Sequence, residues 1–311
     1  MTTLFTNPPQ PLPQPRAALP RPVVKNQPAR RTYLPPLTPA VRNEADLSTF
    51  IQEHPGLPAH TAVLGVCDDH LPVLFDLSDA ESGAPIVLAN ARSGKTMLLQ
   101  TWLRTAFEFD RAGTLRATVI ASRPEEWSKM SQMQNCSQIA APGTPEALAA
   151  LSAVVETIQQ RLERRGRIQP QMVFFDDLAF LPGARTDFQL AVDQILRLGP
   201  QVNIWPMAAL STGQALEMGR WVRHFRVRVL GNMPNSAAMR LGAFDGLDAE
   251  GLIPRRQFAV RVGGAWMSFQ SLRLNEDDRE RAQKLQDEPA AGRSREAFVS
   301  DEPEANDEDE E

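Results

Sequence analysis

The sequence predicts an α/β fold, in which a mostly parallel sheet is flanked by helices. Short apolar runs of strand length alternate along the chain with longer segments whose apolar residues recur every three or four positions. Such alternation is typical of parallel sheets, because helices connect their successive strands. Two of the apolar runs also end in polar residues, GKT and DD, at the strand ends where open α/β sheets bind ligands.

Composition divides the 311 residues into three parts. Residues 1–40 hold eleven prolines and five basic residues but no acid. We expect them to form a disordered arm that is a tether or, alternatively, binds a partner protein. Residues 276–311 hold 15 acids and 5 bases, and self-repulsion predicts a disordered acidic tail. Residues 41–275 carry 23 charges of each sign and are predicted to form the folded domain.

Membrane and disulfide signals are absent from the sequence. No apolar run approaches the ~20 residues of a membrane helix, and the Pro-rich beginning lacks the apolar segment of a secretory signal. Cys67 and Cys136 lie far apart without His or Cys neighbours at ligand spacing, so ordinary thiols are expected rather than a disulfide. These features predict a cytoplasmic protein without membrane insertion.

The first half of the predicted domain contains a hairpin, two buried strands and a helix. Strands at 61–66 and 72–77 flank a short turn. APIVLANA (84–91) and ATVIAS (117–122) are mostly apolar on both alternating sets of positions, which is typical of strands covered on both faces. The intervening residues 96–107 have helical spacing.

A long helix is predicted at TPEALAALSAVVETIQQRLERRG. Thr144 is a suitable N-cap, Pro145 suits the first turn, and Gly166 suits the end. One face of this helix is expected to be apolar, and its residues are Leu148, Leu151, Val155, Ile158 and Leu162.

The second half of the domain supplies the remaining strands. MVFFDDLAFL is a third buried strand with acids at its end, and FQLAVDQILRLG is a helix. VNIWPMAALST is a fourth strand, weakened by Pro206 because proline cannot donate to a ladder. FRVRVLG and the hairpin QFAVRVGGAWMSFQS complete the core, with Gly263–Gly264 as the turn.

The segment ANARSGKT lies between a strand and a helix and nearly matches the phosphate loop G-x-x-x-x-G-K-[ST]. Such a loop binds phosphates through backbone N–H groups and a helix N-terminus, while its lysine reaches the β and γ phosphates and its hydroxyl ligates Mg²⁺. We therefore expect a triphosphate, ATP, and Mg²⁺ here, with Thr96 as a metal ligand. The predicted binding residues are Ala89, Asn90, Ala91, Arg92, Ser93, Gly94, Lys95 and Thr96.

Two residues of this loop depart from the pattern. Ala89 stands where the first glycine belongs, and it fits there if its φ is negative. Arg92 either adds positive charge near the phosphates or points to solvent. The alternative interpretation of the whole segment is a surface loop that matches the pattern by chance.

Asp176 and Asp177 follow the apolar run MVFF. In nucleotide-hydrolysing sheets the first carboxylate holds the hydration shell of Mg²⁺, and the second polarises the attacking water. Asp177 is one methylene shorter than the glutamate usual at the second place, about 1.5 Å of lost reach, which would slow hydrolysis or require a water relay. The alternative is that either aspartate caps a helix beginning at Leu178.

From about 61 to 271 the chain resembles the FtsK/HerA family of ring-forming DNA-translocating ATPases. GVCDDHLPVLFDL resembles the family's G-x-D-x-x-G-x-P-V-x-x-D-L, with Cys67 at the first aspartate position and His70 replacing the second glycine. ASRPEEW corresponds to its D-P-K strand end, where Ser122 and Arg123 depart. QQRLERR resembles E-M-x-x-R, DDLAFL resembles D-E-x-A-x-L, and FRVRVLGNMPNSAAMRLG resembles the closing R-I-x-F-x-V region. NIWPMAALS resembles G-I-H-L-I-L-A-T-Q and places Ser211 at the sensor glutamine.

This resemblance implies a RecA-like P-loop core that hydrolyses ATP in a homo-oligomeric ring, a hexamer, acting on double-stranded DNA. Lys95 and Asp177 would then be catalytic, Asp176 would bind the metal, and Ser211 would contact the γ phosphate. Arg197 and Arg226 are candidates for an arginine that acts on a neighbouring subunit's site, although solvated surface arginines are the alternative. Trp127 and Trp205 are expected to pack rather than to stack on a base.

Three hypotheses for the function remain open. The first is a DNA motor, although the neutral domain lacks the broad basic stripe of strong phosphate binders. The second is a nucleotide-binding switch or scaffold without efficient turnover, because Ala89, Asp177, Ser211 and the Ser122–Arg123 pair all depart from the family pattern. The third is a motor that moves protein, as in secretion systems.

Deleting residues 1–40 is expected to leave the fold and nucleotide binding intact, because a proline-rich polar segment buries little surface. Thermal melting followed by circular dichroism and titration with a fluorescent ATP analogue compare the two chains. Loss of folding in the shortened chain would show that the arm packs on the domain.

Overall fold

The computed structural model describes residues 46–274, apart from positions 78, 80–82, 111, 134, 164–168, 244–245 and 263 and the side chain of residue 137. The predicted arm, the predicted tail and the predicted helix end at Gly166 lie outside these residues, so the three part boundaries stay predictions. Within the described residues, no helix combines the length and apolar character that crossing a bilayer requires.

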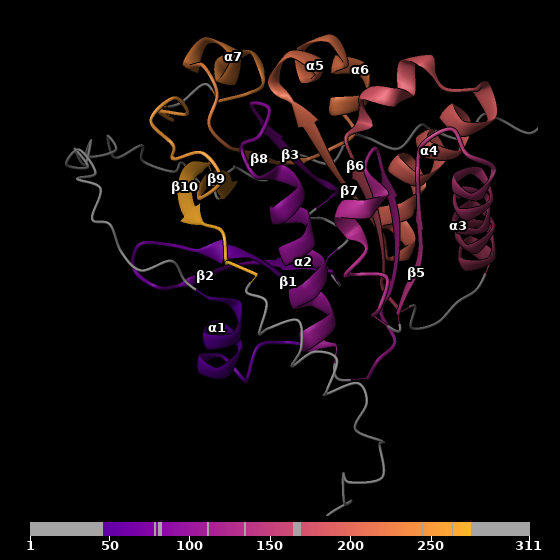
Figure 1. The fold of residues 1–311 in the computed structure, drawn as a ribbon, viewed down its shortest axis with the longest axis horizontal. Helices are drawn as coiled ribbons and strands as arrows, with labels where there is room; N and C mark the ends of the chain where they lie inside the picture. The colour runs from indigo at the N-terminus through magenta and orange to yellow at the C-terminus, as the bar shows by residue number, and fades with distance from the viewer. Residues whose placement is uncertain are drawn as a thin grey trace, which may run out of the picture. The chain divides into compact units, whose positions relative to one another are not determined.

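One ten-stranded sheet organises the described residues, in the order β2-β1-β10-β9-β8-β3-β7-β6-β4-β5 (Figure 1). The strands are β1 (Thr61–Val66), β2 (Pro72–Asp76), β3 (Pro85–Ala89), β4 (Arg116–Ala121), β5 (Cys136–Ala140), β6 (Gln171–Asp176), β7 (Ile204–Ser211), β8 (Val227–Leu230), β9 (Gln257–Val262) and β10 (Ala265–Gln270). The six strands from β8 to β5 are parallel, and the other four add antiparallel pairs. The α/β prediction is confirmed, and the predicted hairpin β1–β2 belongs to the same sheet.

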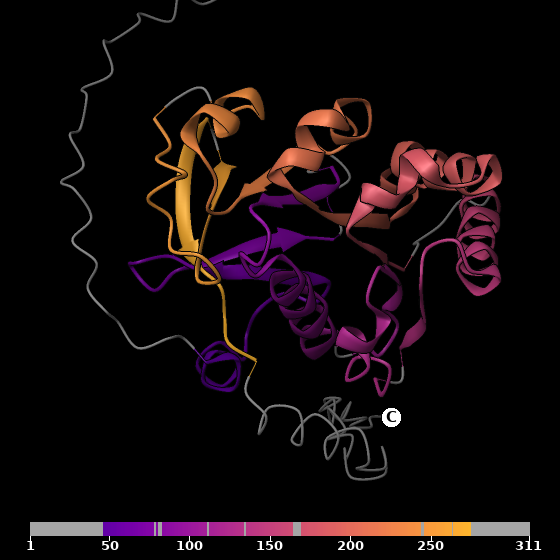
Figure 2. The same ribbon diagram turned by 45° about the horizontal axis from the view of Figure 1, so that its top comes forward.

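Helices cover both faces of this sheet. The α-helices are α1 (Leu47–Glu53), α2 (Lys95–Phe109), α3 (Pro145–Glu163), α4 (Thr186–Leu198), α5 (Thr212–Glu217), α6 (Gly219–Val222) and α7 (Asn235–Arg240), and the 3-10 helices are η1 (Pro124–Trp127), η2 (Leu178–Gly183) and η3 (Gly199–Val202). Helices α3 to α7 share a core with Ile86 and Leu88 of β3, whereas α2 packs with Val87 on the opposite face. Figure 2 shows α3 and α4 packed side by side and separated from α2.

Double coverage explains why the central strands are continuous apolar runs. All five residues of β3 are buried, because alternate side chains of a strand point to opposite faces and both faces are covered here. Burying one such side chain removes it from water with a gain of about 1.5–3 kcal/mol. The strand that carries the predicted phosphate loop is therefore held rigidly at the middle of the sheet.

Pro206 lies inside β7, a central strand, without shortening it. β7 pairs with β6 from Ile204 onward, but its register with β3 begins only at Ala208. Pro206 therefore precedes the ladder with β3, and its missing N–H breaks no hydrogen bond on that side. The expectation of a weakened strand was wrong for this reason.

The buried face of α3 is rotated from the predicted one. Its fully buried residues are Ala147, Ala150, Leu151, Val154 and Ile158. The predicted core residue Leu162 is 51% exposed, and small alanines take the closest positions against the sheet and α4. Thr144 caps the helix as predicted, since its hydroxyl accepts the N–H of Ala147 at 3.2 Å.

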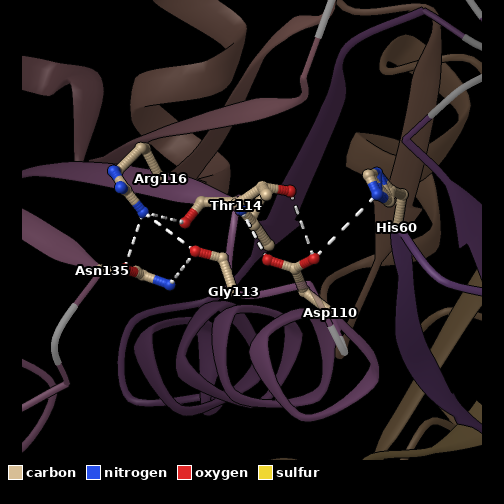
Figure 3. Close-up of polar contacts among 7 residues, drawn as sticks. His60, Asp110, Gly113, Thr114, Arg116 and Asn135 are labelled. Atoms are coloured by element: carbon tan, nitrogen blue, oxygen red, sulfur yellow. Dashed lines mark hydrogen bonds and ion pairs between the residues drawn. The ribbon is translucent and has the colours of Figure 1, made fainter. Parts of the chain in front are cut away.

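Polar contacts fix the turn between α2 and β4, at the end of α2 remote from the predicted phosphate loop (Figure 3). The buried Asp110 carboxylate accepts the N–H of Leu115 at 2.5 Å and lies 4.0 Å from Nε2 of His60. Arg116 donates to the side-chain oxygen of Asn135 at 2.7 Å. The Asp110 contact satisfies groups that would otherwise be buried without partners where the helix turns back into the sheet, whereas the Arg116–Asn135 bond is exposed.

Candidate nucleotide-phosphate site

A cleft of about 850 Å³ opens at the carboxyl ends of β3, β6 and β7. Lys95 and Thr96 line it from the first turn of α2, directly after the loop that follows β3, while Asp176 lies at the end of β6 and Ser211 at the end of β7. Because β7 lies between β3 and β6, the loop and the acid come from strands about 10 Å apart. The fold thus brings together two sequence signals that are 80 positions apart.

The loop after β3 contains two residues with left-handed backbone. Gly94 has φ +85° and Arg92 has φ +62°. Glycine adopts this region without strain, whereas an arginine does not. The chain then enters α2 at Lys95, and the first N–H groups of a helix have no intrahelical acceptor, so they are available to an anion.

Ala89 occupies the first glycine position without backbone strain. It is the last, fully buried residue of β3 and has no positive φ. Its side chain faces Gly231, which follows β8, because a Cβ built at Gly231 would lie 2.9 Å from the Cβ of Ala89. A glycine on the neighbouring segment therefore provides the room that the alanine requires.

Lys95 folds back over its own loop. Its Nζ donates to the carbonyl oxygens of Asn90 at 2.9 Å and Ala89 at 3.3 Å. Burial lowers the pKa of Lys95, and the carboxylates of Asp177 and Asp176 act in the opposite direction. The charged amine is thus partly desolvated beside acids, a setting that strengthens its attraction to a phosphate.

Asp176 is held at both carboxylate oxygens. Oδ1 accepts the hydroxyl of Thr96 at 3.0 Å, and Oδ2 accepts the indole N–H of Trp127 at 2.9 Å. Burial raises the pKa of Asp176, while these two hydrogen bonds lower it. Trp127 and Trp205 are both fully buried, as expected, but Trp127 also orients the predicted metal-binding acid.

The oxygen pair of Thr96 and Asp176 fits Mg²⁺. Two adjacent ligands at about 2.1 Å in an octahedral shell lie roughly 3.0 Å apart, and the two oxygens are 3.0 Å apart. No group of three or more His, Cys, Asp or Glu that could hold a metal occurs among the described residues. Mg²⁺ itself keeps several waters and substrate phosphates as ligands and takes only one or two from the protein.

Asp177 both lines the cleft and caps a helix. Its backbone is left-handed, with φ +77°, and its Oδ1 accepts the N–H of Ala179 at 3.1 Å. Asp176 thus contacts Thr96, the other predicted metal ligand, whereas Asp177 is the residue that caps η2.

Ser211 ends β7 level with Ala89 of β3. Its hydroxyl donates to the side-chain oxygen of Gln214, which also accepts the N–H of Ser211 at 3.2 Å. Gln214 lines the cleft as well. A glutamine is thus present beside the predicted sensor position, three residues later on the first turn of α5, where the sequence pattern did not indicate it.

The back of the loop is anchored by Asn90. Its backbone N–H donates to the carbonyl of Asn232 at 2.9 Å, and its side-chain oxygen accepts the hydroxyl of Thr212 at 3.0 Å. Asn232 in turn donates to the carbonyls of Glu250 and Leu252 at 2.9 and 3.0 Å. The loop is therefore tied to the ends of both strands that flank β3.

The predicted arginines lie elsewhere. Among the described residues that line the cleft, neither Arg197 nor Arg226 occurs. Arg197 is exposed on α4 and lies 3.5 Å from Asp193, and Arg226 precedes β8 at the opposite end of the sheet. The arginines that line the cleft are Arg92 of the loop, Arg123, which is paired with Glu126, and Arg255, which the sequence patterns missed.

Together these features place a loop of the phosphate-loop pattern opposite a magnesium-compatible oxygen pair. No protein-family model matches the chain, and no curated protein matches it. Solved structures match by fold. EssC ATPases 2 and 3 from Geobacillus thermodenitrificans share 14% identity at a TM-score of 0.64, over 82% of this chain and 53% of that one. EccC ATPases 2 and 3 from Thermomonospora curvata, in complex with a signal sequence peptide, share 15% identity at a TM-score of 0.59, over 76% of this chain and 44% of that one.

A third match is the monomer form of the pCW3 conjugation coupling protein TcpA with ATPγS. It shares 15% identity at a TM-score of 0.57, over 75% of this chain and 72% of that one. The chain spans about half the length of the EssC and EccC chains. At these identities the likeness shows the fold: the chain has the α/β fold of these ATPases.

Gly231→Ala is expected to destabilise the domain by about 1–3 kcal/mol through overpacking and to weaken nucleotide binding, because its Cβ would lie 2.9 Å from Ala89 and 3.0 Å from Phe258. The double variant Ala89→Gly, Gly231→Ala should recover part of the loss, since only the contact with Phe258 remains. Urea unfolding of all four chains measures this coupling. Equal stability of Gly231→Ala and wild type would contradict it.

Asp176→Asn is expected to raise the melting temperature at neutral pH by a few degrees, about 2–4 °C per kcal/mol. Burial raises the pKa of Asp176 above its usual value of 3.8, so charging it costs stability as the pH rises through 3.8 toward the raised pKa. An amide could still accept from Trp127 and donate to Thr96. The increase in melting temperature should vanish below pH 3.8. A melting temperature of Asp176→Asn below that of wild type at pH 7 would refute this prediction.

Proposed function

We propose that this chain binds ATP with Mg²⁺ and hydrolyses it as a motor of the FtsK/HerA type. The observation that carries the proposal is the 3.0 Å contact between Thr96 and Asp176, with Lys95 beside it on the same loop. This is the hydroxyl–carboxylate pair that P-loop enzymes use to hold Mg²⁺ next to the phosphates. The observed fold places both groups at the mouth of one cleft.

Each site residue has a role in the proposed hydrolysis. The N–H groups at the start of α2 and the Lys95 amine bind the phosphates, and Lys95 exchanges its two carbonyl acceptors for phosphate oxygens. Thr96 and Asp176 would hold Mg²⁺, which neutralises phosphate charge when bound. Asp177 polarises the attacking water, and Ser211 contacts the γ phosphate.

The proposed cargo is double-stranded DNA, moved through a homo-oligomeric ring, a hexamer, in the cytoplasm. The FtsK/HerA resemblance supports this, and so does the likeness to TcpA, which is a conjugation coupling protein. Arg197 and Arg226 are both exposed and outside their own cleft, which suits an arginine that completes a neighbouring subunit's site. EccC was solved with a signal sequence peptide, so protein is the alternative cargo.

A nucleotide-binding switch is the second candidate function. Two groups needed for turnover are already engaged, since Asp177 accepts from Ala179 and the Ser211 hydroxyl donates to Gln214. Turnover would require both contacts to rearrange. A switch would bind ATP tightly and release little phosphate.

Phosphate release with Mg²⁺ and ATP, measured with and without linear duplex DNA, tests the proposal. DNA is expected to stimulate turnover, and Lys95→Ala should reduce it by roughly 100-fold or more, because the main phosphate cation is lost. Arg185→Ala is the matched control, since this exposed arginine lies outside the cleft and forms a surface ion pair with Asp187.

The outcomes separate the candidates. DNA-stimulated release that Lys95→Ala abolishes supports the DNA motor. Tight ATP binding with negligible release supports the switch, and release stimulated by a peptide rather than by DNA supports protein cargo. Equal and substantial phosphate release by Lys95→Ala and Arg185→Ala would contradict all three.

A further inference from the structure

Arg255 joins the phosphate loop from a distant part of the chain. It stands two residues before β9 and is 163 positions from Arg92. Its backbone N–H donates to the carbonyl of Ser93 at 3.1 Å, and its Nε donates to the carbonyl of Arg92 at 3.1 Å. One residue thus binds two successive peptide units of the loop.

The backbone around Arg255 is shaped for this contact. Its φ is +66°, left-handed, like the φ of +62° at Arg92, to which it is bonded. A Cβ at Gly94 would lie 2.9 Å from the Cα of Arg255, so the approach requires glycine at that position. Strained backbone persists where the surrounding structure holds it, commonly at functional sites.

Two nitrogens of the Arg255 guanidinium remain as hydrogen-bond donors for a ligand. Within the described part of the chain its Nε has one acceptor and its two Nη groups have none, while the residue lines the cleft. Of the other cations that line the cleft, Arg123 pairs with Glu126 and Lys95 donates to two loop carbonyls, whereas Arg92 is an exposed residue of the loop itself. A planar pair of Nη donors matches two oxygens of one phosphate.

We propose that Arg255 is a second phosphate-binding cation of this site, acting within its own chain. Nε keeps the loop in its phosphate-binding shape, and the Nη groups bind phosphate oxygens of the nucleotide. This inference rests on the proposed nucleotide binding and adds a residue from the C-terminal part of the fold. The segment before β9 would then respond directly to nucleotide occupancy.

Displacement titrations with a fluorescent ATP analogue and Mg²⁺ test this role in the full-length chain. Arg255→Met keeps the length of the side chain and the backbone N–H, but removes the guanidinium. Its affinity for the ATP analogue should fall roughly 10- to 100-fold, the range for charge-assisted hydrogen bonds. Its affinity for adenosine, which lacks phosphate, should not change. Arg255→Lys should be intermediate, and Arg240→Met, at an exposed arginine outside the cleft, should match wild type.

Unchanged ATP affinity in Arg255→Met, beside a loss in Lys95→Ala, would overturn this inference and leave the proposed function standing. Equal losses for ATP and adenosine would also overturn it, because they would show a purely structural role. Failure of the wild-type chain to bind either ligand would overturn both proposals. If Arg255→Met does not fold, the Arg255→Lys titration decides by the same criteria.

Discussion

The structure of the cleft depends on one contact, the hydrogen bond between Thr96 and Asp176. The two residues belong to elements on either side of β7, so they meet only because three neighbouring parallel strands end at the same edge of the sheet. The register fixes their relative heights: Ala89 pairs with Ser211, and Asp176 pairs with Ala209, two residues earlier on β7. A shift of the strands by even one residue would turn alternate side chains to the wrong face and separate the two oxygens.

The sequence predicted most of the parallel sheet and most of this cleft. Continuous apolar runs located β3, β4 and β6, and GKT and DD located the loop and the acid. The less apolar edge strand β5 (Cys136–Ala140) was missed, since its sequence CSQIA lacks such a run. The buried face of α3 was misplaced because alanine, a weak signal in an apolar pattern, takes the tightest positions there.

Contacts between distant residues were beyond sequence reasoning. Nothing in ASRPEEW indicates that Trp127 would reach 2.9 Å from Asp176, because that contact depends on how β4 and β6 are paired. Likewise, Ala89 looked like a defect of the phosphate loop. The residue that makes room for it, Gly231, directly follows β8, a strand that only the fold places next to β3. Residues in left-handed backbone that are not glycine, such as Arg92 and Arg255, also leave no sequence signal.

The loop is anchored twice to the same C-terminal stretch. Asn90 is bonded to Asn232, which holds the carbonyls of Glu250 and Leu252, and Arg255 holds the next turn of the loop. A bound phosphate that draws the Lys95 amine away from the Asn90 carbonyl would remove one hydrogen bond of the loop. The bonds from the loop to Asn232 and Arg255 would remain. Since the stretch continues into the β9–β10 hairpin, a change at the loop has a bonded route to the antiparallel part of the sheet. A motor and a switch both need such a connection between the nucleotide and the rest of the fold. They differ in whether ATP hydrolysis returns these hydrogen bonds to their starting arrangement.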